Sequence, residues 1–75
     1  AYDFYLQGRG YLQRNDRVDD VRSAMQLFER ALGIDGNYAP ARAGLADAQW
    51  FMYERTRDRS WVQKARASAE EALRS

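Results

Sequence analysis

Residues 24–32 read AMQLFERAL, and residues 65–73 read ARASAEEAL. Both stretches follow one spacing, A-x3-[FA]-x2-A-L, in which the shared positions recur every one to four residues. At about 3.6 residues per turn, these positions lie on one face of a helix. Alanines on that face allow a neighbouring helix to approach closely. The duplicated spacing therefore predicts a chain built from helical repeats.

Apolar residues recur with a helical period along the rest of the chain as well. We expect four helices. They cover about residues 2–14, residues from about 18 through the first copy of the spacing at 24–32, about residues 38–57, and residues from 60 onward. No strand-like alternation is present in the sequence. The predicted fold class is therefore all-α, with four antiparallel helices in two helix-turn-helix units.

The apolar positions of each expected helix predict its buried face. Gly8 weakens its helix by about 1 kcal/mol relative to alanine, so we expect it to lie where a partner backbone comes close. The four faces expected to be buried consist of Phe4, Gly8, Tyr11 and Leu12; of Val21, Ala24, Met25, Phe28, Ala31 and Leu32; of Ala41, Leu45, Ala48 and Met52; and of Val62, Ala65, Ala69, Ala72 and Leu73.

Turn and capping residues separate the helices. Gly36 is expected to take a left-handed conformation, and Asn37 to cap the next helix, whose first turn holds Pro40. Ser60 and Gln63 have the spacing of a capping box. The first connection draws its turn and capping chemistry from Asn15, Asp16, Asp19 and Asp20.

Composition excludes several classes of function. The 75 residues suffice for one small domain, and they include no cysteine and no histidine, so the usual zinc ligands and histidine-activated nucleophiles are absent. We expect no metal, no cofactor and no enzymatic activity. No apolar run is long enough to span a membrane, and no secretory segment opens the chain, so cytoplasmic location is expected. Because the chain starts at Ala1 rather than methionine, we expect a piece of a longer protein.

Residues around the first copy of the spacing complete a longer pattern. Phe4, Gly8 and Tyr11 place an aromatic, a small and an aromatic residue on the helix before it. Asp35 and Asn37 follow it as a turn. This order resembles the tetratricopeptide repeat, a helix-turn-helix unit of about 34 residues. Ala24, Phe28, Ala31 and Leu32 match the second helix of that unit, whereas Gly36 stands where a proline is usual.

The second half of the chain resembles the same family less fully. Leu45 and Ala46 stand at its Leu-Gly landmark, but Arg42 and Gln49 stand where aromatics are usual. Ala24 and Ala46 are 22 residues apart, as the family spacing requires, whereas the turn inside each repeat is expanded. The resemblance implies two repeats, at about 2–35 and 38–74, in a short right-handed α-solenoid.

The resemblance implies a noncatalytic protein-protein interaction module. The stretch from Tyr2 to Tyr11, together with the later segment from Asp35 to Ala48, is similar to repeats of larger bacterial regulatory proteins. In this family the first helix of each repeat lines a concave face, which holds a peptide or a partner helix. The residues that this geometry places on the face are Tyr5, Arg9, Leu12 and Gln13 on the first helix and Ala43, Asp47, Trp50 and Phe51 on the third.

A second hypothesis is a structural or oligomerisation segment whose faces pack on neighbouring repeats or on a second copy. Two repeats leave the outer faces of the terminal helices uncovered, and about three repeats or a capping helix are ordinarily needed. The terminal-carboxylate clamp of the family is disfavoured, because Tyr5 and Ala43 occupy two of its positions.

Three other constellations have simpler explanations. Asp16, Asp19 and Asp20 lack the ligand alternation of a calcium loop. Arg55, Arg57 and Arg59 with Trp61 could contact a nucleic acid, but acidic residues are interleaved and the net charge is only +1, from 12 basic and 11 acidic residues. Asp47 and Glu54 are about 10 Å apart along a helix, without a further catalytic group. Nucleic-acid and membrane partners are not expected.

Overall fold

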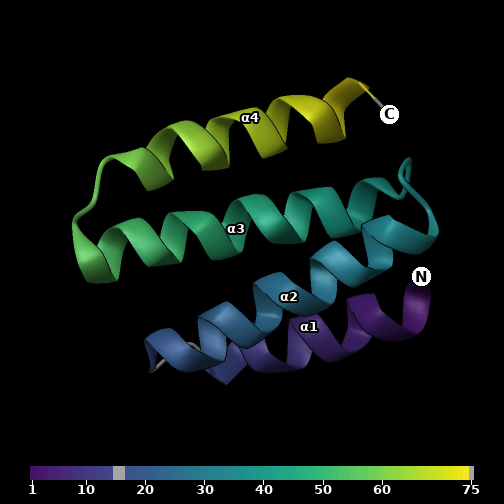
Figure 1. Ribbon diagram of the computed structural model, residues 1–75, viewed down its shortest axis with the longest axis horizontal. Helices are drawn as coiled ribbons and strands as arrows, with labels where there is room; N and C mark the ends of the chain where they lie inside the picture. Colours follow the sequence, from purple (N-terminus) through teal and green to yellow (C-terminus); the bar gives the residue numbers. More distant parts are fainter. Residues whose placement is uncertain (15–16, 75) are drawn as a thin grey trace.

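The structure is a computed structural model that describes residues 1–14 and 17–74. All of the regular structure in these residues is helical. The helices are α1 (Tyr2–Arg14), α2 (Val18–Ile34), α3 (Ala39–Thr56) and α4 (Ser60–Arg74) (Figure 1). The all-α prediction is confirmed, and each expected helix is present close to its predicted bounds. Asn15 and Asp16, which were expected to supply turn chemistry, lie outside the described residues.

The helices form two hairpins that meet through α3. Helix α1 packs on α2, α3 packs on both α2 and α1, and α4 contacts α3 alone among the described helices. Figure 1 shows α4 at one edge, α3 beside it, and the crossed pair α1 and α2 at the other edge, with both termini at the same end. One face of α4 is therefore without a helical neighbour in the described chain.

The core centres on the ring of Phe28, which is fully buried between two glycines. A Cβ atom on Gly8 of α1 would lie 2.7 Å from this ring, and a Cβ atom on Gly44 of α3 would also lie 2.7 Å from it. Real Cβ atoms do not approach so closely, so only glycine lets both helices reach the ring. Gly8 thus makes room for the side chain of Phe28, whereas we expected the backbone of a partner helix at this place. The buried cluster consists of Val21, Ala24, Phe28, Ala31, Ala41, Leu45, Ala48 and Met52.

The predicted faces of α2 and α3 are confirmed, although Met25 and Leu32 are only half-buried. The predicted face of α4 is wrong at two positions. Ala69 is exposed, and Leu73 keeps 88% of its surface, whereas Ser68 is buried. The reason is that, among the described residues, α4 packs on α3 alone, and α3 covers only part of the apolar face of α4.

The turn between α2 and α3 differs from the prediction. No described glycine has a positive φ, so Gly36 is not left-handed. Instead, the Asp35 carboxylate accepts the backbone N–H of Asn37 at 3.0 Å, and the Asp35 carbonyl accepts that of Tyr38 at 3.1 Å. An Asx turn of this kind reverses the chain without a left-handed residue. Tyr38, rather than Asn37, is the N-cap, and its side chain makes no capping bond.

The turn between α3 and α4 also uses other residues than expected. Arg57 caps α3 in the left-handed conformation, with φ 60°. The Asp58 carboxylate accepts the backbone N–H of Ser60 at 3.0 Å, and this bond lowers the pKa of Asp58. A carboxylate two residues upstream therefore caps α4, in place of the predicted box of Ser60 with Gln63.

Polar contacts join the second hairpin. The Ser68 hydroxyl donates to Gln49 Oε1 at 2.8 Å, and both side chains are buried. Arg42 forms a salt bridge with Glu71 and also donates to the Gly36 carbonyl at 2.9 Å. The two positions that depart from the aromatic pattern, Arg42 and Gln49, thus both make side-chain bonds to α4.

The two glycines of α1 offer a matched pair of variants. Gly8→Ala places a methyl group against Phe28, whereas a Cβ on Gly10 meets nothing within 4 Å. Gly10→Ala should raise the free energy of unfolding by about 0.5–1 kcal/mol. Gly8→Ala should be less stable than Gly10→Ala by about 1–3 kcal/mol, because the core is overpacked. Urea denaturation followed by circular dichroism measures the free energy of unfolding of both variants. If Gly8→Ala and Gly10→Ala were equally stabilised, the close contact between Gly8 and the Phe28 ring would be contradicted.

The buried Gln49–Ser68 bond predicts a second result. Ser68→Ala leaves the Gln49 carbonyl buried without its donor, so the free energy of unfolding should fall by about 1–3 kcal/mol. The double variant Ser68→Ala with Gln49→Leu removes both polar groups and should regain most of that loss. Thermal and urea unfolding of the three proteins test this, and a double variant no better than Ser68→Ala would exclude the mechanism.

Candidate binding groove between α1 and α3

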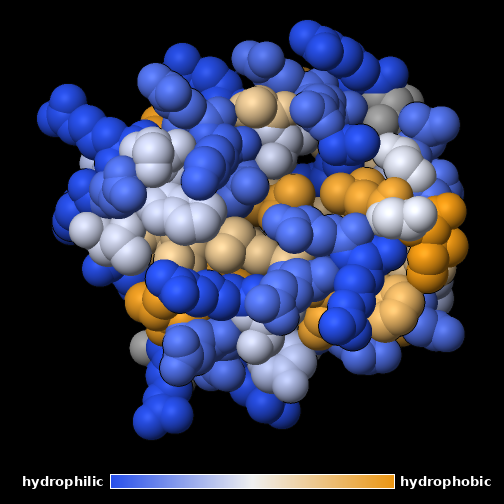
Figure 2. Space-filling view, in the orientation of Figure 1, coloured by the Kyte–Doolittle hydropathy of each residue, from blue (hydrophilic) through white to orange (hydrophobic). Residues whose placement is uncertain are grey.

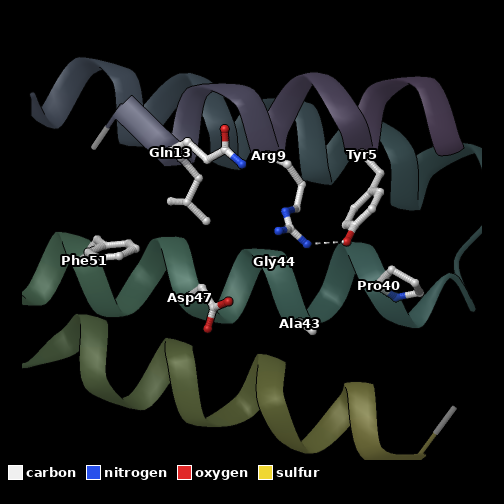
Figure 3. A pocket seen from close by; sticks show the side chains of 9 residues that line it. Tyr5, Arg9, Gln13, Pro40, Ala43, Gly44, Asp47 and Phe51 are labelled. Atoms are coloured by element: carbon white, nitrogen blue, oxygen red, sulfur yellow. Dashed lines mark hydrogen bonds between the residues drawn. The ribbon is translucent and has the colours of Figure 1, made fainter. Parts of the chain in front are cut away.

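A groove of about 360 Å³ runs between α1 and α3. Tyr5 and Arg9 reach from α1 toward α3 across it (Figure 3). We call it the α1–α3 groove. Its lining residues are Tyr5, Arg9, Leu12, Gln13, Pro40, Ala43, Gly44, Asp47 and Phe51.

Helical spacing explains how the two walls arise. Along α1 the lining residues are spaced by four, three and one, and along α3 they follow the same kind of period. Each set therefore forms one stripe on its helix. The two stripes face each other because α1 and α3 both approach the ring of Phe28, through Gly8 and Gly44.

On the α1 side of the groove, Tyr5 is held in place by packing against other aromatic rings. The ring of Tyr5 lies 6.1 Å from that of Phe28, and 5.7 Å from that of Tyr38 in an edge-to-face arrangement. The Tyr5 hydroxyl accepts a hydrogen bond of 2.9 Å from Arg9 Nη1. Tyr5 thus connects the groove to the core and restricts the position of the Arg9 guanidinium before any ligand binds.

The groove carries one charge of each sign, Arg9 on α1 and Asp47 on α3. The hydrogen bond from Arg9 to Tyr5 raises the pKa of Arg9, and Asp47 adds a smaller effect in the same direction. Arg9 and Asp47 are both exposed, and they come from opposite walls. A bound segment can thus accept hydrogen bonds from a guanidinium and donate to a carboxylate.

Apolar side chains of the groove gather at its far end, beside Gln13 (Figure 3). Leu12 and Phe51 are half-buried against the core cluster, and the Arg55 guanidinium lies 5.2 Å from the centroid of the Phe51 ring. Apolar side chains beside a few placed polar groups are the usual composition of a peptide-binding surface. The α1–α3 groove can thus offer a bound segment an apolar surface, hydrogen-bonding groups and one charge of each sign.

The structure brings together seven of the eight expected face residues. Trp50 is the exception: it stacks on Tyr53 with ring centroids 5.4 Å apart and lies beside Val62 and Ala69, on the side of α3 that faces α4. Sequence reasoning missed Pro40 and Gly44. Pro40 lies seven residues before Asp47 and Gly44 three residues before it, and this helical spacing was the signal that could have found them.

The acidic group near the start of α2 forms no metal site in the described part of the chain. Asp19 and Asp20 lie in the first turn of α2, and Asp16 lies outside the described residues. The residues described contain no group of three or more acidic side chains that could hold a metal ion. Trp61 is covered by Lys64, whose ammonium lies 4.4 Å from the ring centroid.

No helix of the described chain has the length and apolar character needed to cross a lipid bilayer. Comparisons with family models, curated proteins and solved structures gave no match to this chain.

The hydroxyl of Tyr5 can be removed without its ring. Tyr5→Phe keeps the packing on Phe28 and Tyr38 but removes the acceptor of Arg9. The free energy of unfolding should change by less than about 1.5 kcal/mol, since the bond is exposed. NMR relaxation of the Arg9 side chain should show increased mobility. Tyr2→Phe, on the same helix, is the control, and unchanged Arg9 relaxation in Tyr5→Phe would contradict this role of the hydroxyl.

Proposed function

We propose that this chain is a noncatalytic protein-binding module that takes a peptide or a partner helix in the α1–α3 groove. The observation that carries the proposal is the groove itself. Seven residues that the resemblance to the repeat family assigns to one binding face, four from α1 and three from α3, line a single groove that holds exposed polar groups beside apolar ones.

We further propose that the two hairpins are tetratricopeptide-like repeat units of a short right-handed solenoid, within a larger bacterial regulator in the cytoplasm. The duplicated spacing supports this, since Phe28 and Ala69 follow Ala24 and Ala65 at the same interval. The packing of α3 across the α1–α2 hairpin supports it too, because α3 is then the first helix of the next unit.

A second candidate is a structural or oligomerisation segment. The observation that favours it is the uncovered face of the second hairpin, where Leu73 is 88% exposed and Trp50 is 48% exposed. Such a segment would self-associate through this face and would need no ligand in the α1–α3 groove.

Peptide selection tests the first candidate. A phage-displayed library of random peptides is selected on the immobilised chain, and the enriched peptides are synthesised for calorimetry. Arg9→Ala and Asp47→Ala should each weaken binding by about five- to thirtyfold, as residues at the centre of an interface do. Both side chains are exposed, so the fold should be unaffected.

Trp50→Ala is the matched control, because Trp50 lies outside the α1–α3 groove on the neighbouring face of α3. Its affinity for the same peptides should equal that of the unmodified chain. Sedimentation at several concentrations should show a monomer. Peptides that bind Arg9→Ala and Asp47→Ala unchanged, or an obligate oligomer, would refute the proposal in favour of the second candidate.

A further inference from the structure

The second hairpin presents an apolar groove that no described helix covers. The groove lies between α3 and α4, and its largest hollow has a volume of about 510 Å³. Apolar side chains reach the surface in a band across the middle of the molecule in Figure 2. We call this hollow, with the smaller one beside it, the α3–α4 groove. Its lining includes Ala43, Ala46, Trp50, Val62, Ala69 and Leu73.

The first hairpin shows what covers a groove of this kind. There, α3 lies across α1 and α2, and it brings Gly44 against the ring of Phe28. The duplicated spacing pairs Phe28 with Ala69, and the same repeat alignment pairs Gly8 with Ala46. Phe28 and Gly8 meet in the first hairpin, and Ala69 and Ala46 line one hollow in the second.

The two hairpins differ in whether the groove or the covering helix has to supply the large side chain. In the first, the groove supplies the large side chain, Phe28, and the covering helix supplies a glycine. In the second, the groove has only the methyl groups of Ala69 and Ala46 at these places. Interiors pack at nearly constant density, so a covering helix has to bring the missing volume itself.

We propose that the α3–α4 groove binds an α-helix of a partner protein that carries a bulky apolar side chain, leucine- or phenylalanine-sized, at the place where α3 carries Gly44. The side chain inserts between Ala69 and Ala46, and flanking apolar residues of the helix cover Trp50 and Leu73. The inference rests on the pairing of the hairpins as repeat units proposed above. It concerns a different groove, on the other side of Pro40, Ala43 and Asp47, which line both grooves.

A head-to-tail second copy fits the groove less well. In the repeat alignment, the positions of α1 that correspond to the docking face of α3 include Asp3 and Arg14, in place of Ala41 and Met52. Ala41 and Met52 are fully buried where α3 docks. A copy docking through α1 would have to bury a carboxylate and a guanidinium, which is costly without partners.

The test uses helical probes made from α3, the helix that covers the first hairpin. Labelled peptides of residues 37–57 carry either Gly44→Leu or Gly44→Ala. Both replacements remove the helix-weakening glycine, and only leucine adds bulk. The Gly44→Leu peptide cannot replace α3 on the first hairpin, because Phe28 leaves no room for a Cβ there. Fluorescence anisotropy should show that it binds the chain at least about tenfold more tightly than the Gly44→Ala peptide.

Two exposed alanines of α4 provide the matched protein variants. Ala69→Leu fills the hollow and should reduce the affinity of the Gly44→Leu peptide to that of the Gly44→Ala peptide. Ala67→Leu adds the same side chain outside the groove and should leave affinity unchanged. Circular dichroism verifies that both variants are folded.

Equal affinities of the two peptides, or binding that survives Ala69→Leu, would overturn the proposal. If Arg9→Ala rather than Ala69→Leu abolishes binding, the peptide occupies the α1–α3 groove, and only the proposal for the α3–α4 groove fails. If neither peptide binds and sedimentation shows a dimer that Ala69→Leu dissociates, the occupant is a second copy, and the partner-helix proposal is wrong.

Discussion

The contact on which the structure depends is the ring of Phe28 between Gly8 and Gly44. The ring comes from α2, the glycines come from α1 and α3, and no Cβ could be placed at either position without displacing the ring. One aromatic side chain therefore sets the separation of three helices. The α1–α3 groove lies between the two helices that this contact aligns, and Tyr5 of the groove packs on the same ring. Core geometry and surface geometry are thus coupled through Phe28.

The second hairpin is joined by a different kind of contact. Ser68 donates a buried hydrogen bond to Gln49, and Arg42 pairs with Glu71. Such contacts fix the register of two helices, because polar groups lose their partners when the helices slide. They fill less space than an aromatic ring, and a groove remains open above Ala69. The two halves of the chain share a spacing, but the first is centred on a buried aromatic ring, whereas the second has a buried polar bond between its helices.

Several aromatic rings lie near the surface beside a cation. The Arg9 guanidinium lies 5.8 Å from the centroid of the Tyr5 ring, and that of Arg14 lies 5.6 Å from Tyr11. Exposed pairs of this kind contribute about 0.5–1 kcal/mol each. Their main consequence here is positional, since Arg9 is oriented toward the α1–α3 groove by the residue that lies one turn before it. The aromatic content of 13% is therefore shared between the core and the placement of surface charges.

The sequence by itself determined the four helices. The period of apolar residues and the turn residues between helices are local properties, so the helix bounds could be predicted from them. The stripe of Tyr5, Arg9 and Leu12 was implied by the resemblance to a repeat family and not by spacing alone. The turn at Asp35 and the capping by Asp58 are local as well, since each bond spans two residues, but they were not predicted because several neighbouring acceptors compete for the same N–H groups. Only the tertiary structure decided that Trp50 faces α4, because a side chain between two faces of a helix is buried or exposed according to where the neighbouring helices lie.

The exposure of Leu73 has the same origin. A period predicts which side chains share a face, but it does not predict whether another helix covers that face, and α4 has a helical neighbour on one side only within the described chain.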